Sequence, residues 1–475
     1  MNMLQQQLTR YFGHEAFRPG QQDVIEAVLR GEDVVAVLPT GSGKSLCYQL
    51  PTKLLPHATL IISPLLSLMQ DQVEQLKKMG ERRVIALNSF LNRSEKQHVL
   101  QTLSQYEFIF TSPEMLQQSN VRQLLRQLPL SLIVVDEAHC LSQWGFDFRP
   151  DYLQIADVFS DMKRPGILAL SATATMQVLR DIKLYLHMQQ PFELIQPIDR
   201  PNIRLMRESF MTQEEKLAWA YDYIVRANGA GILYTQSRKK CEQYAEALMM
   251  RQVRVAYYHA GMDLYDRQLI QQQFLDGHID WVVATNAFGM GVHKDDVRHI
   301  VHDVFPATMA NYMQEIGRAG RDGKEAIAVL LYAQGDEQVV TYVATEELPN
   351  DLQVDAYMLH AQPQQLVQEG AVSETQFRVL HYWLQQKNPA EVKQLMAQLR
   401  LQKSNEIDAM QRVVHATTCL RHMIIGAFGQ QLHEKVAQCC VNCGATYELH
   451  VEAPKKEAFA MDVTWQERLS ALFPQ

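Results

Sequence analysis

Short apolar runs separated by longer amphipathic stretches are the feature of this chain that most restricts its fold. Between Val34 and Leu170 these runs are VVAVL, TLIIS, EFIF, SLIVV and ILAL. A continuous apolar run of this length is typical of a parallel strand that is buried on both faces. Because each run ends in polar residues, the pattern predicts a doubly wound parallel sheet with functional residues at the carboxyl ends of its strands.

A second series of the same kind follows a proline-rich segment. Pro191, Pro197 and Pro201 lie close together in and around PFELIQPIDRPN, where the periodicity stops as it does at a domain linker. The runs GILYT, VRVAYY, DWVVAT, RHIVH and AIAVLLY then predict a second sheet, and helical patterns such as TQFRVLHYWLQQ take over beyond Asp336. We therefore expect α/β domains over residues 1–195 and 196–338, and a mainly helical region over residues 339–475.

The composition favours a soluble globular protein. Of the 475 residues, 47% are hydrophobic, and the N-terminal residues show neither a basic segment followed by an apolar run nor a long apolar stretch. We therefore expect a cytoplasmic protein without a membrane partner. The net charge of −8 is unlike that of a simple nucleic-acid binder, so any contact with DNA or RNA must use a local basic patch.

The stretch VVAVLPTGSGKS places a glycine-rich turn directly after a strand and before an expected helix. Gly41 and Gly43 allow backbone N–H groups to approach a phosphate chain, Lys44 can reach the β- and γ-phosphates, and Ser45 can bind Mg²⁺. Leu38 stands where the stricter P-loop pattern has its first glycine, and a flexible loop is the simpler alternative. The position after a buried strand favours an ATP-binding P-loop formed by Thr40, Gly41, Ser42, Gly43, Lys44 and Ser45.

Asp136 and Glu137 follow the apolar run SLIVV directly. An aspartate at a strand end can hold Mg²⁺, and an adjacent glutamate can orient or deprotonate the attacking water. An acidic pair after a strand is by itself usually a solvated loop. Together with the P-loop, the pair predicts hydrolysis of a phosphoanhydride.

Two arginines in QEIGRAGRDG, Arg318 and Arg321, belong to the second predicted domain. The charge that develops on the γ-phosphate is best stabilised by a rigid and permanently ionised donor, which arginine supplies. Surface arginines at the start of a helix are the alternative interpretation. The neighbouring glycines and the expected cleft between two domains favour arginine fingers.

Taken in order, these motifs resemble those of RecQ-type DNA helicases of helicase superfamily 2, over nearly all of residues 10 to 335. The corresponding segments are FRPGQ, LPTGSGKSLCYQLP, SPLLSLMQDQ, TSPE, DEAH, SAT, VVATNAFGMGV and YMQEIGRAGRDG. The resemblance implies two tandem RecA-like domains and an ATP- and Mg²⁺-dependent motor. Such a motor would move 3′ to 5′ on single-stranded DNA and unwind duplex DNA in recombination and repair, with a single-stranded DNA-binding protein as a further partner.

The resemblance also implies roles for individual residues. Gln21 would read the adenine edge, and Arg18 would position the base. His14 stands where relatives often have an aromatic residue, which weakens the expected stacking on adenine. The DNA backbone would be contacted by Ser63, Pro64, Thr111, Ser112 and Thr285.

The segment AHCLSQWGFDFRP resembles the aromatic-rich loop that distinguishes RecQ helicases from their neighbours in the superfamily. Bases stack on Trp144, Phe146, Phe148 and Arg149 in this interpretation, at about 1 to 3 kcal/mol each. The loop follows the Mg²⁺ carboxylates, so it would couple DNA binding to hydrolysis. By their spacing alone, Trp144, Phe146 and Phe148 could instead form one face of a half-buried strand.

Four cysteines near the end of the chain, Cys419, Cys439, Cys440 and Cys443, suggest a structural zinc site. The family usually ends its zinc motif C-x2-C-x2-C, but Thr446 stands where the last ligand is expected. The fourth ligand could be Cys439 or a histidine such as His422 or His433, and a remnant without metal is the alternative.

Residues 351 to 405 form an unusually long segment before the cysteines, and we expect a helical insert that serves as scaffold. The 32 residues after Cys443 are too few for the winged helix and the small helical domain of longer relatives. Two other functions stay open. The first is an RNA helicase of the same superfamily, and the second is a DNA-stimulated ATPase that remodels or anneals DNA without processive unwinding. If the protein is bacterial, we expect it at the nucleoid.

Overall fold

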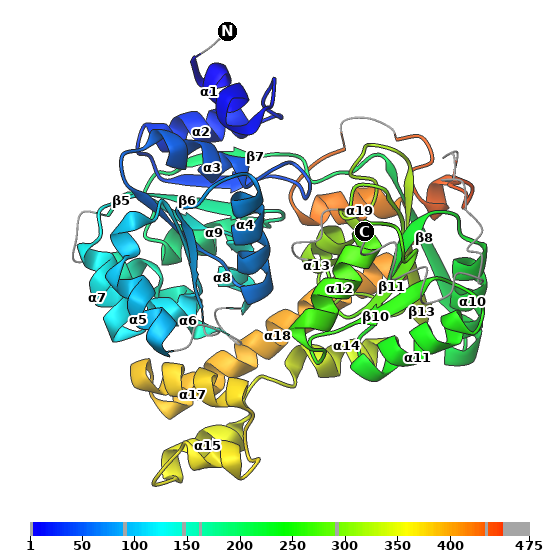
Figure 1. The fold of residues 1–475 in the computed structure, drawn as a ribbon. Helices are drawn as coiled ribbons and strands as arrows, with labels where there is room; N and C mark the ends of the chain where they lie inside the picture. The colour runs from blue at the N-terminus through cyan, green and yellow to red at the C-terminus, as the bar shows by residue number, and fades with distance from the viewer. Residues whose placement is uncertain are drawn as a thin grey trace, which may run out of the picture.

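The computed structural model describes residues 3–88, 93–144, 149–160, 164–289, 294–432 and 436–449. It shows two parallel-sheet domains followed by helices that pack against both of them (Figure 1). The predicted fold class is confirmed. None of the described helices is both long enough and apolar enough to cross a membrane.

The first domain contains a seven-stranded parallel sheet in the order β3-β4-β2-β5-β6-β1-β7. The central strands are apolar and almost fully buried, because helices cover both faces of the sheet. Strand β1 lies between β6 and β7, with Val34 opposite both Leu168 and Phe192. The strands are β1 (Val34–Val37), β2 (Ala58–Ile62), β3 (Val84–Leu87), β4 (Phe108–Thr111), β5 (Leu130–Val135), β6 (Gly166–Ser171) and β7 (Phe192–Ile195).

The helices of the first domain alternate with its strands. They are α1 (Met3–Phe12), α2 (Gln21–Leu29), α3 (Leu46–Leu54), α4 (Leu66–Lys78), α5 (Arg93–Gln101), α6 (Pro113–Leu116), α7 (Ser119–Gln127), α8 (His139–Trp144) and α9 (Met176–Tyr185), with short 3-10 helices η1 (Leu103–Gln105), η2 (Pro150–Gln154) and η3 (Ala156–Phe159).

The second domain contains a six-stranded parallel sheet in the order β10-β11-β9-β12-β13-β8. Helix α10 begins with a capping box, in which Thr212 and Glu215 satisfy each other's backbone N–H groups. The strands are β8 (Ile203–Phe210), β9 (Ala230–Tyr234), β10 (Val255–Tyr258), β11 (Trp281–Ala284), β12 (Val297–His302) and β13 (Ala326–Ala333), and the helices are α10 (Gln213–Arg226), α11 (Arg238–Met249), α12 (Leu264–Leu275) and α13 (Met309–Ile316).

Three strands were not among those predicted from apolar runs. Strand β3 is short, β7 lies inside the proline-rich segment, and β8 carries charged residues such as Arg207 and Glu208. All three lie at or near a sheet edge, where side chains reach solvent and a continuous apolar run is not required. The proline-rich segment therefore contains both the last strand of the first sheet and the connection to the second.

The helical region is shared between the two domains. The part we call the helical insert, residues 351–399, contributes Val379, Leu380 and Trp383 to the same apolar cluster as the first sheet. Its helix α17 contacts η2. The helices of the whole region are α14 (Asp336–Thr345), α15 (Asp351–Leu359), α16 (Gln365–Gln368), α17 (Glu374–Gln386), α18 (Pro389–Val414) and α19 (Leu420–Ala427), followed by the 3-10 helix η4 (Val441–Cys443).

Helix α18 extends from the insert to the second domain (Figure 1). It begins with Asn388 as its cap and Pro389 at its first position, both favourable there. Val392, Met396 and Leu399 pack into the first domain's cluster, whereas Ile407, Met410, Val413 and Val414 pack into the second domain's cluster. No residue between positions 400 and 406 is buried.

Candidate nucleotide site and metal site

The glycine-rich loop connects the end of β1 to the start of α3. Gly41 and Gly43 have φ angles of 81° and 78°, a left-handed conformation that other residues seldom adopt. A Cβ atom at position 43 would lie only 2.8 Å from Nε2 of Gln21. The loop conformation therefore depends on glycine at these positions, as expected for a P-loop.

Lys44 and the acidic pair come together at the carboxyl ends of β1 and β5. Nζ of Lys44 lies 3.2 Å from Oε1 of Glu137. The backbone N–H of Glu137 donates to Oδ1 of Asp136 at 2.9 Å, and that of Asp136 donates to Ile62 O at 2.9 Å. Glu137 itself has a φ of 48°, which is unusual for a residue other than glycine and typical of functional sites.

The two carboxyl groups have different electrostatic environments. Burial, together with the adjacent charge of Glu137, raises the pKa of Asp136 above its ordinary value. Burial also opposes ionisation of Glu137, but the charge and hydrogen bond of Lys44, together with the charges of His139 and Arg318, outweigh it and lower the pKa of Glu137. Glu137 is therefore held as a carboxylate, which is the form that can accept a proton from water.

His139 connects the acidic pair to the end of β6. Its Nδ1 lies 3.0 Å from Oγ of Ser171 and 3.3 Å from Oε2 of Glu137. Ser171 in turn donates to Thr173 O at 2.6 Å. Burial lowers the pKa of His139, which favours the neutral imidazole in this network. The SAT segment, residues 171–173, is therefore linked to the acidic pair through His139.

Arg18 and Gln21 contact the backbone of the P-loop. Nε2 of Gln21 donates to Ser42 O at 2.9 Å and to Gly43 O at 3.0 Å, and a guanidinium nitrogen of Arg18 donates to Gly41 O. The backbone N–H of Arg18 donates to Oε1 of Gln21 at 2.9 Å. The residues that we expect at the adenine base therefore also hold the loop that we expect at the phosphates.

The loop between α13 and β13 carries both predicted arginine fingers and meets the P-loop of the other domain. We call residues 317–321 the arginine loop. Oγ1 of Thr40 donates to Gly317 O at 2.9 Å. Arg321 packs against Gly41, where an added Cβ would lie 3.3 Å from its Cγ, and Arg318 donates to Gly289 O. The predicted fingers are therefore brought to the nucleotide site from the second domain.

A third arginine at this contact between the domains, Arg200, was missed by our sequence analysis. Its guanidinium donates to Gly317 O at 3.2 Å and to Gly320 O at 2.7 Å. Burial, and then the charges of Arg318 and Arg200, lower the pKa of Arg321 to about 10. The only signal for Arg200 was its place in the proline-rich segment, which we interpreted as a linker.

The composition of the site fits a nucleoside triphosphate and Mg²⁺. Lys44 and the three arginines Arg18, Arg318 and Arg321 lie around the glycine-rich loop and the acidic pair, so a polyanion would relieve their mutual repulsion. Among the described residues, Oγ of Ser42 and Oγ1 of Thr173 are buried there without a hydrogen-bond partner. Ser45 directly precedes α3 and Asp136 directly follows β5, which are the places from which we expected them to hold Mg²⁺.

The residues predicted to contact DNA lie at the ends of several strands. In the first domain, the Ser63 backbone N–H donates to Thr111 O at 3.0 Å, and Ser112 caps α6. Arg149 donates to Oε1 of Glu114 at 2.5 Å and to Pro64 O. Thr285 follows β11 in the second domain. Ser63 and Thr111 are almost fully buried, so any contact they make with DNA would use limited surface.

The aromatic-rich segment is only partly described. Trp144 is the last residue of α8, but its side chain lies outside the described residues, as do Phe146 and Phe148. Helix α8 forms the first part of the segment, and η2 begins at its last residue, Pro150. The contact of these aromatic rings with DNA therefore stays a prediction.

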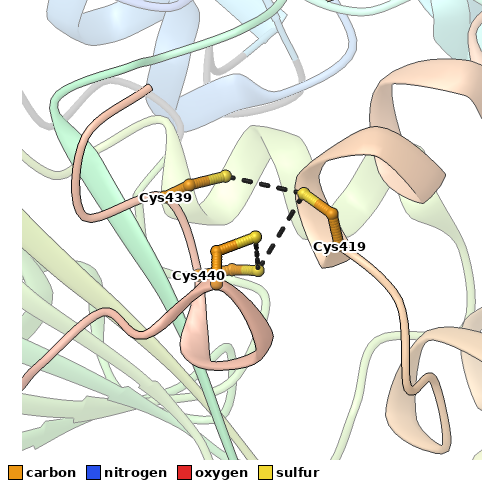
Figure 2. Close-up of side chains that lie close together, drawn as sticks. Cys419, Cys439 and Cys440 are labelled. Atoms are coloured by element: carbon orange, nitrogen blue, oxygen red, sulfur yellow. Dashed lines mark hydrogen bonds between the residues drawn. The ribbon is translucent and has the colours of Figure 1, made fainter. Parts of the chain in front are cut away.

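The four cysteines meet at the start of α19 and around η4, and Figure 2 labels three of them, Cys419, Cys439 and Cys440. Their sulfur atoms all lie within 4.8 Å of one another, with Cys419 and Cys439 3.6 Å apart and Cys440 and Cys443 3.5 Å apart. Tetrahedral zinc with four thiolates at about 2.3 Å requires sulfur separations of about 3.8 Å. Among the described residues, this cysteine cluster fits zinc, with Cys439 as the fourth ligand. His422 is not part of it, and His433 lies outside the described residues.

We expect the purified protein to contain about one zinc ion per chain. Cys439→Ser should remove most of it, because a hydroxyl is a much weaker zinc ligand than a thiolate. Elemental analysis after dialysis measures the metal content. Cys241→Ala, which removes a buried cysteine outside the cluster, is the matched control and should keep its zinc. Full zinc occupancy in Cys439→Ser would contradict the assignment of this ligand.

Comparisons with known proteins match both parallel-sheet domains. The family described as DEAD/DEAH box helicase matches residues 18–182, and the helicase conserved C-terminal domain matches residues 215–323. A probable ATP-dependent DNA helicase RecS of Bacillus subtilis is 39% identical, over 100% of this chain and 98% of that protein. The ATP-dependent DNA helicase RecQ of the same organism is 32% identical, over 95% of this chain and 69% of its own length. The chain belongs to the RecQ-type ATP-dependent DNA helicases.

Other relatives of this helicase are longer. The ATP-dependent DNA helicase RecQ of Haemophilus influenzae is 41% identical, over 69% of this chain and 53% of its own length. Among solved structures, the helicase Lhr of Mycobacterium smegmatis superposes with a TM-score of 0.59 at 20% identity, over 72% of this chain and 49% of that one. The DEAD-box helicase Mss116 has a TM-score of 0.60 at 17% identity, over 80% and 89% of the two chains. At these identities the structures support the two-domain fold alone.

Proposed function

We propose that this helicase hydrolyses ATP with Mg²⁺, moves 3′ to 5′ on single-stranded DNA and separates duplex DNA during recombination and repair. The observation that carries the proposal is the contact between domains at the ATP site. Thr40 and Gly41 of the first domain touch Gly317 and Arg321 of the second. A nucleotide bound between these groups is contacted by both domains, so the state of the nucleotide can set their arrangement.

The chemistry assigned to each residue follows from its position. Ser45 and Asp136 would hold Mg²⁺, which neutralises charge on the β- and γ-phosphates. Lys44 binds the same phosphates from the P-loop, and Arg318 and Arg321 approach from the opposite domain. Glu137 orients the attacking water and accepts its proton, since Lys44 at 3.2 Å keeps the carboxyl group ionised.

DNA reaches this chemistry through the aromatic-rich segment in our proposal. The segment begins directly after Glu137, and η2 at its other end packs into the apolar cluster of the first domain through Tyr152. Arg149 is held by Glu114 and Pro64, next to the strand ends that we expect to contact the DNA backbone. A base that stacks in this segment would therefore act on groups that are connected to Glu137.

Trp144→Ala should uncouple DNA binding from hydrolysis. We expect DNA affinity to change little, because the sugar-phosphate contacts stay, while the stimulation of ATPase by DNA collapses. Fluorescence anisotropy measures the affinity, and a coupled ATPase assay with and without single-stranded DNA measures the stimulation. A large drop in the thermal midpoint with proportionate loss of both activities would instead support a half-buried strand.

The direct test of the proposed function is strand displacement on duplexes with a 3′ or a 5′ single-stranded tail. We expect ATP-dependent separation of the 3′-tailed duplex. Separation of only the 5′-tailed duplex would contradict the direction, and DNA-stimulated hydrolysis without separation would favour a remodelling or annealing ATPase. Stronger stimulation by RNA than by DNA would favour an RNA helicase. Addition of a single-stranded DNA-binding protein tests whether it is a partner, and we expect these reactions at cytoplasmic DNA.

A further inference from the structure

A single buried arginine connects the cysteine cluster to the start of the second domain. Arg421 lies in α19, two residues after Cys419, and only 2% of it is exposed. Its Nη1 lies 2.5 Å from Oδ1 of Asp199 and 3.0 Å from Arg200 O. Its Nη2 donates to Ile203 O and, at 3.3 Å, to Cys439 O. One guanidinium group therefore fixes residues 199–203 relative to the cluster.

The segment held by Arg421 in turn holds the arginine loop. Arg200 donates to three carbonyl groups of that loop: Gly317 at 3.2 Å, Ala319 at 3.2 Å and Gly320 at 2.7 Å. Nδ2 of Asn202 also donates to Gly320 O at 2.8 Å. Carbonyls on both sides of Arg318 are thus bound by one forked donor, which fixes the backbone that carries the finger.

Apolar packing runs parallel to these polar contacts. Ile424 and Ile425 of α19 and Met313 and Ile316 of α13 line one small cavity with Asp199, Arg200 and Arg421. Helix α13 ends at Ile316, directly before the arginine loop. A shift of α19 would therefore move both residues 199–203, which hold the arginine loop, and helix α13, which directly precedes that loop.

We propose that Arg200 and Arg421 are positioning residues for Arg318 and Arg321, and that with Asp199 they connect the cysteine cluster to the ATP site. The inference rests on the proposed function, because it requires Arg318 to act on the terminal phosphate. Neither residue has to touch the nucleotide. Their effect is to keep the finger in the geometry that stabilises the transition state.

The test compares a transition-state analogue with a ground-state ligand. ADP with aluminium fluoride imitates the phosphoryl group in transfer, whereas ADP alone has no group in the place of the γ-phosphate. For Arg200→Lys and Asp199→Asn in the full chain, we expect aluminium fluoride to strengthen ADP binding about 10- to 100-fold less than in the wild type, because small displacements of a catalytic group have effects of this size. The affinity for ADP alone should stay the same.

Arg204→Lys is the matched control. Arg204 is also buried and lies in the adjacent strand β8, but it donates to Thr446 O and Glu448 O and pairs with Glu325 rather than with the arginine loop. We expect this variant to lose stability without any change in the effect of aluminium fluoride. An equal loss in Arg204→Lys, or a tenfold weaker affinity for ADP in Arg200→Lys, would overturn the positioning role.

A combined variant separates this inference from the proposed function. If Arg200 acts through Arg318 and Arg321, adding Arg200→Lys to a protein that already carries Arg318→Ala and Arg321→Ala should cause no further loss, so the effects are not additive. Fully additive losses would overturn the positioning role of Arg200 and would leave the proposed role of the arginine fingers unaffected. If Arg318→Ala alone left the effect of aluminium fluoride unchanged, the proposed role of the finger would fail instead.

Metal removal extends the same measurement to the cysteine cluster. Chelation of zinc from the wild-type protein should weaken the effect of aluminium fluoride, while ADP affinity and the helical signal in circular dichroism persist. Chelation should add little in Asp199→Asn, where the connection is already broken. A zinc-free wild-type protein with full response to aluminium fluoride would remove the cluster from the proposal.

Discussion

Lys44→Ala is expected to abolish ATP hydrolysis. Among the described residues, Lys44 is the only lysine whose ammonium group pairs with Glu137, and it lies 3.2 Å from that carboxylate. Without it, the β- and γ-phosphates lose their fixed point charge and the buried acidic pair loses the cation that offsets it. We expect turnover to fall at least about 10³-fold, in line with the loss of a preorganised charge at a transition state.

The measurement is steady-state ATPase with saturating single-stranded DNA. Lys183→Ala is a suitable control, because Lys183 forms a half-exposed pair with Glu193 elsewhere in the first domain and such pairs contribute at most about 1 kcal/mol. It should keep wild-type turnover. Normal hydrolysis by a folded Lys44→Ala protein would show that the glycine-rich loop is not the ATP site.

Arg318→Ala is expected to reduce turnover by a similar factor while ATP still binds. Arginine fingers accelerate hydrolysis by about 10³- to 10⁵-fold, and the effect falls on the chemical step because the developing charge exists only in the transition state. Arg318 is 6% exposed and belongs to the second domain. In our proposal its loss also breaks the link between the nucleotide and that domain, so a domain movement driven by DNA should no longer speed hydrolysis. Arg318→Lys should not restore activity, since an ammonium group cannot replace the planar fork.

Fluorescent ATP analogues measure binding, and single-turnover experiments measure the chemical step. Arg226→Ala removes an exposed arginine of the same domain, whose pair with Asp222 is a solvated helix contact, and it should behave as the wild type. If Arg318→Ala weakened ATP binding and left the rate of the bound state intact, Arg318 would be a binding residue and not a finger.

The sequence predicted those parts of the fold whose signal is local. The apolar runs that became β1, β2 and β5 are buried on both faces, so their periodicity reports their environment directly. The positive φ angles of Gly41 and Gly43 explain why the glycines mark the P-loop. Strand β8 was missed because its exposed half carries charged residues, and charge hides a strand from a search for apolar runs.

The parts that were missed depend on contacts between distant positions. Arg421 and Asp199 are 222 residues apart, and Arg200 meets Gly317 over 117 residues. Nothing in their local sequence distinguishes them from surface residues. The insert was predicted to be helical from its amphipathic pattern, but such a pattern shows only that an apolar face exists and not which domain covers it. For the same reason Cys439 could be offered only as one of several zinc ligands.

Helix α18 places a mechanical condition on the motor. It is about 39 Å long, by the usual rise per residue over its 26 residues, and its two ends are embedded in different lobes. A helix that is fixed at both ends keeps its length if the two domains rotate relative to each other during ATP hydrolysis. Such a movement would bend the helix at the solvated turns between positions 400 and 406, or would move α17 against η2, next to the segment that we propose to contact DNA.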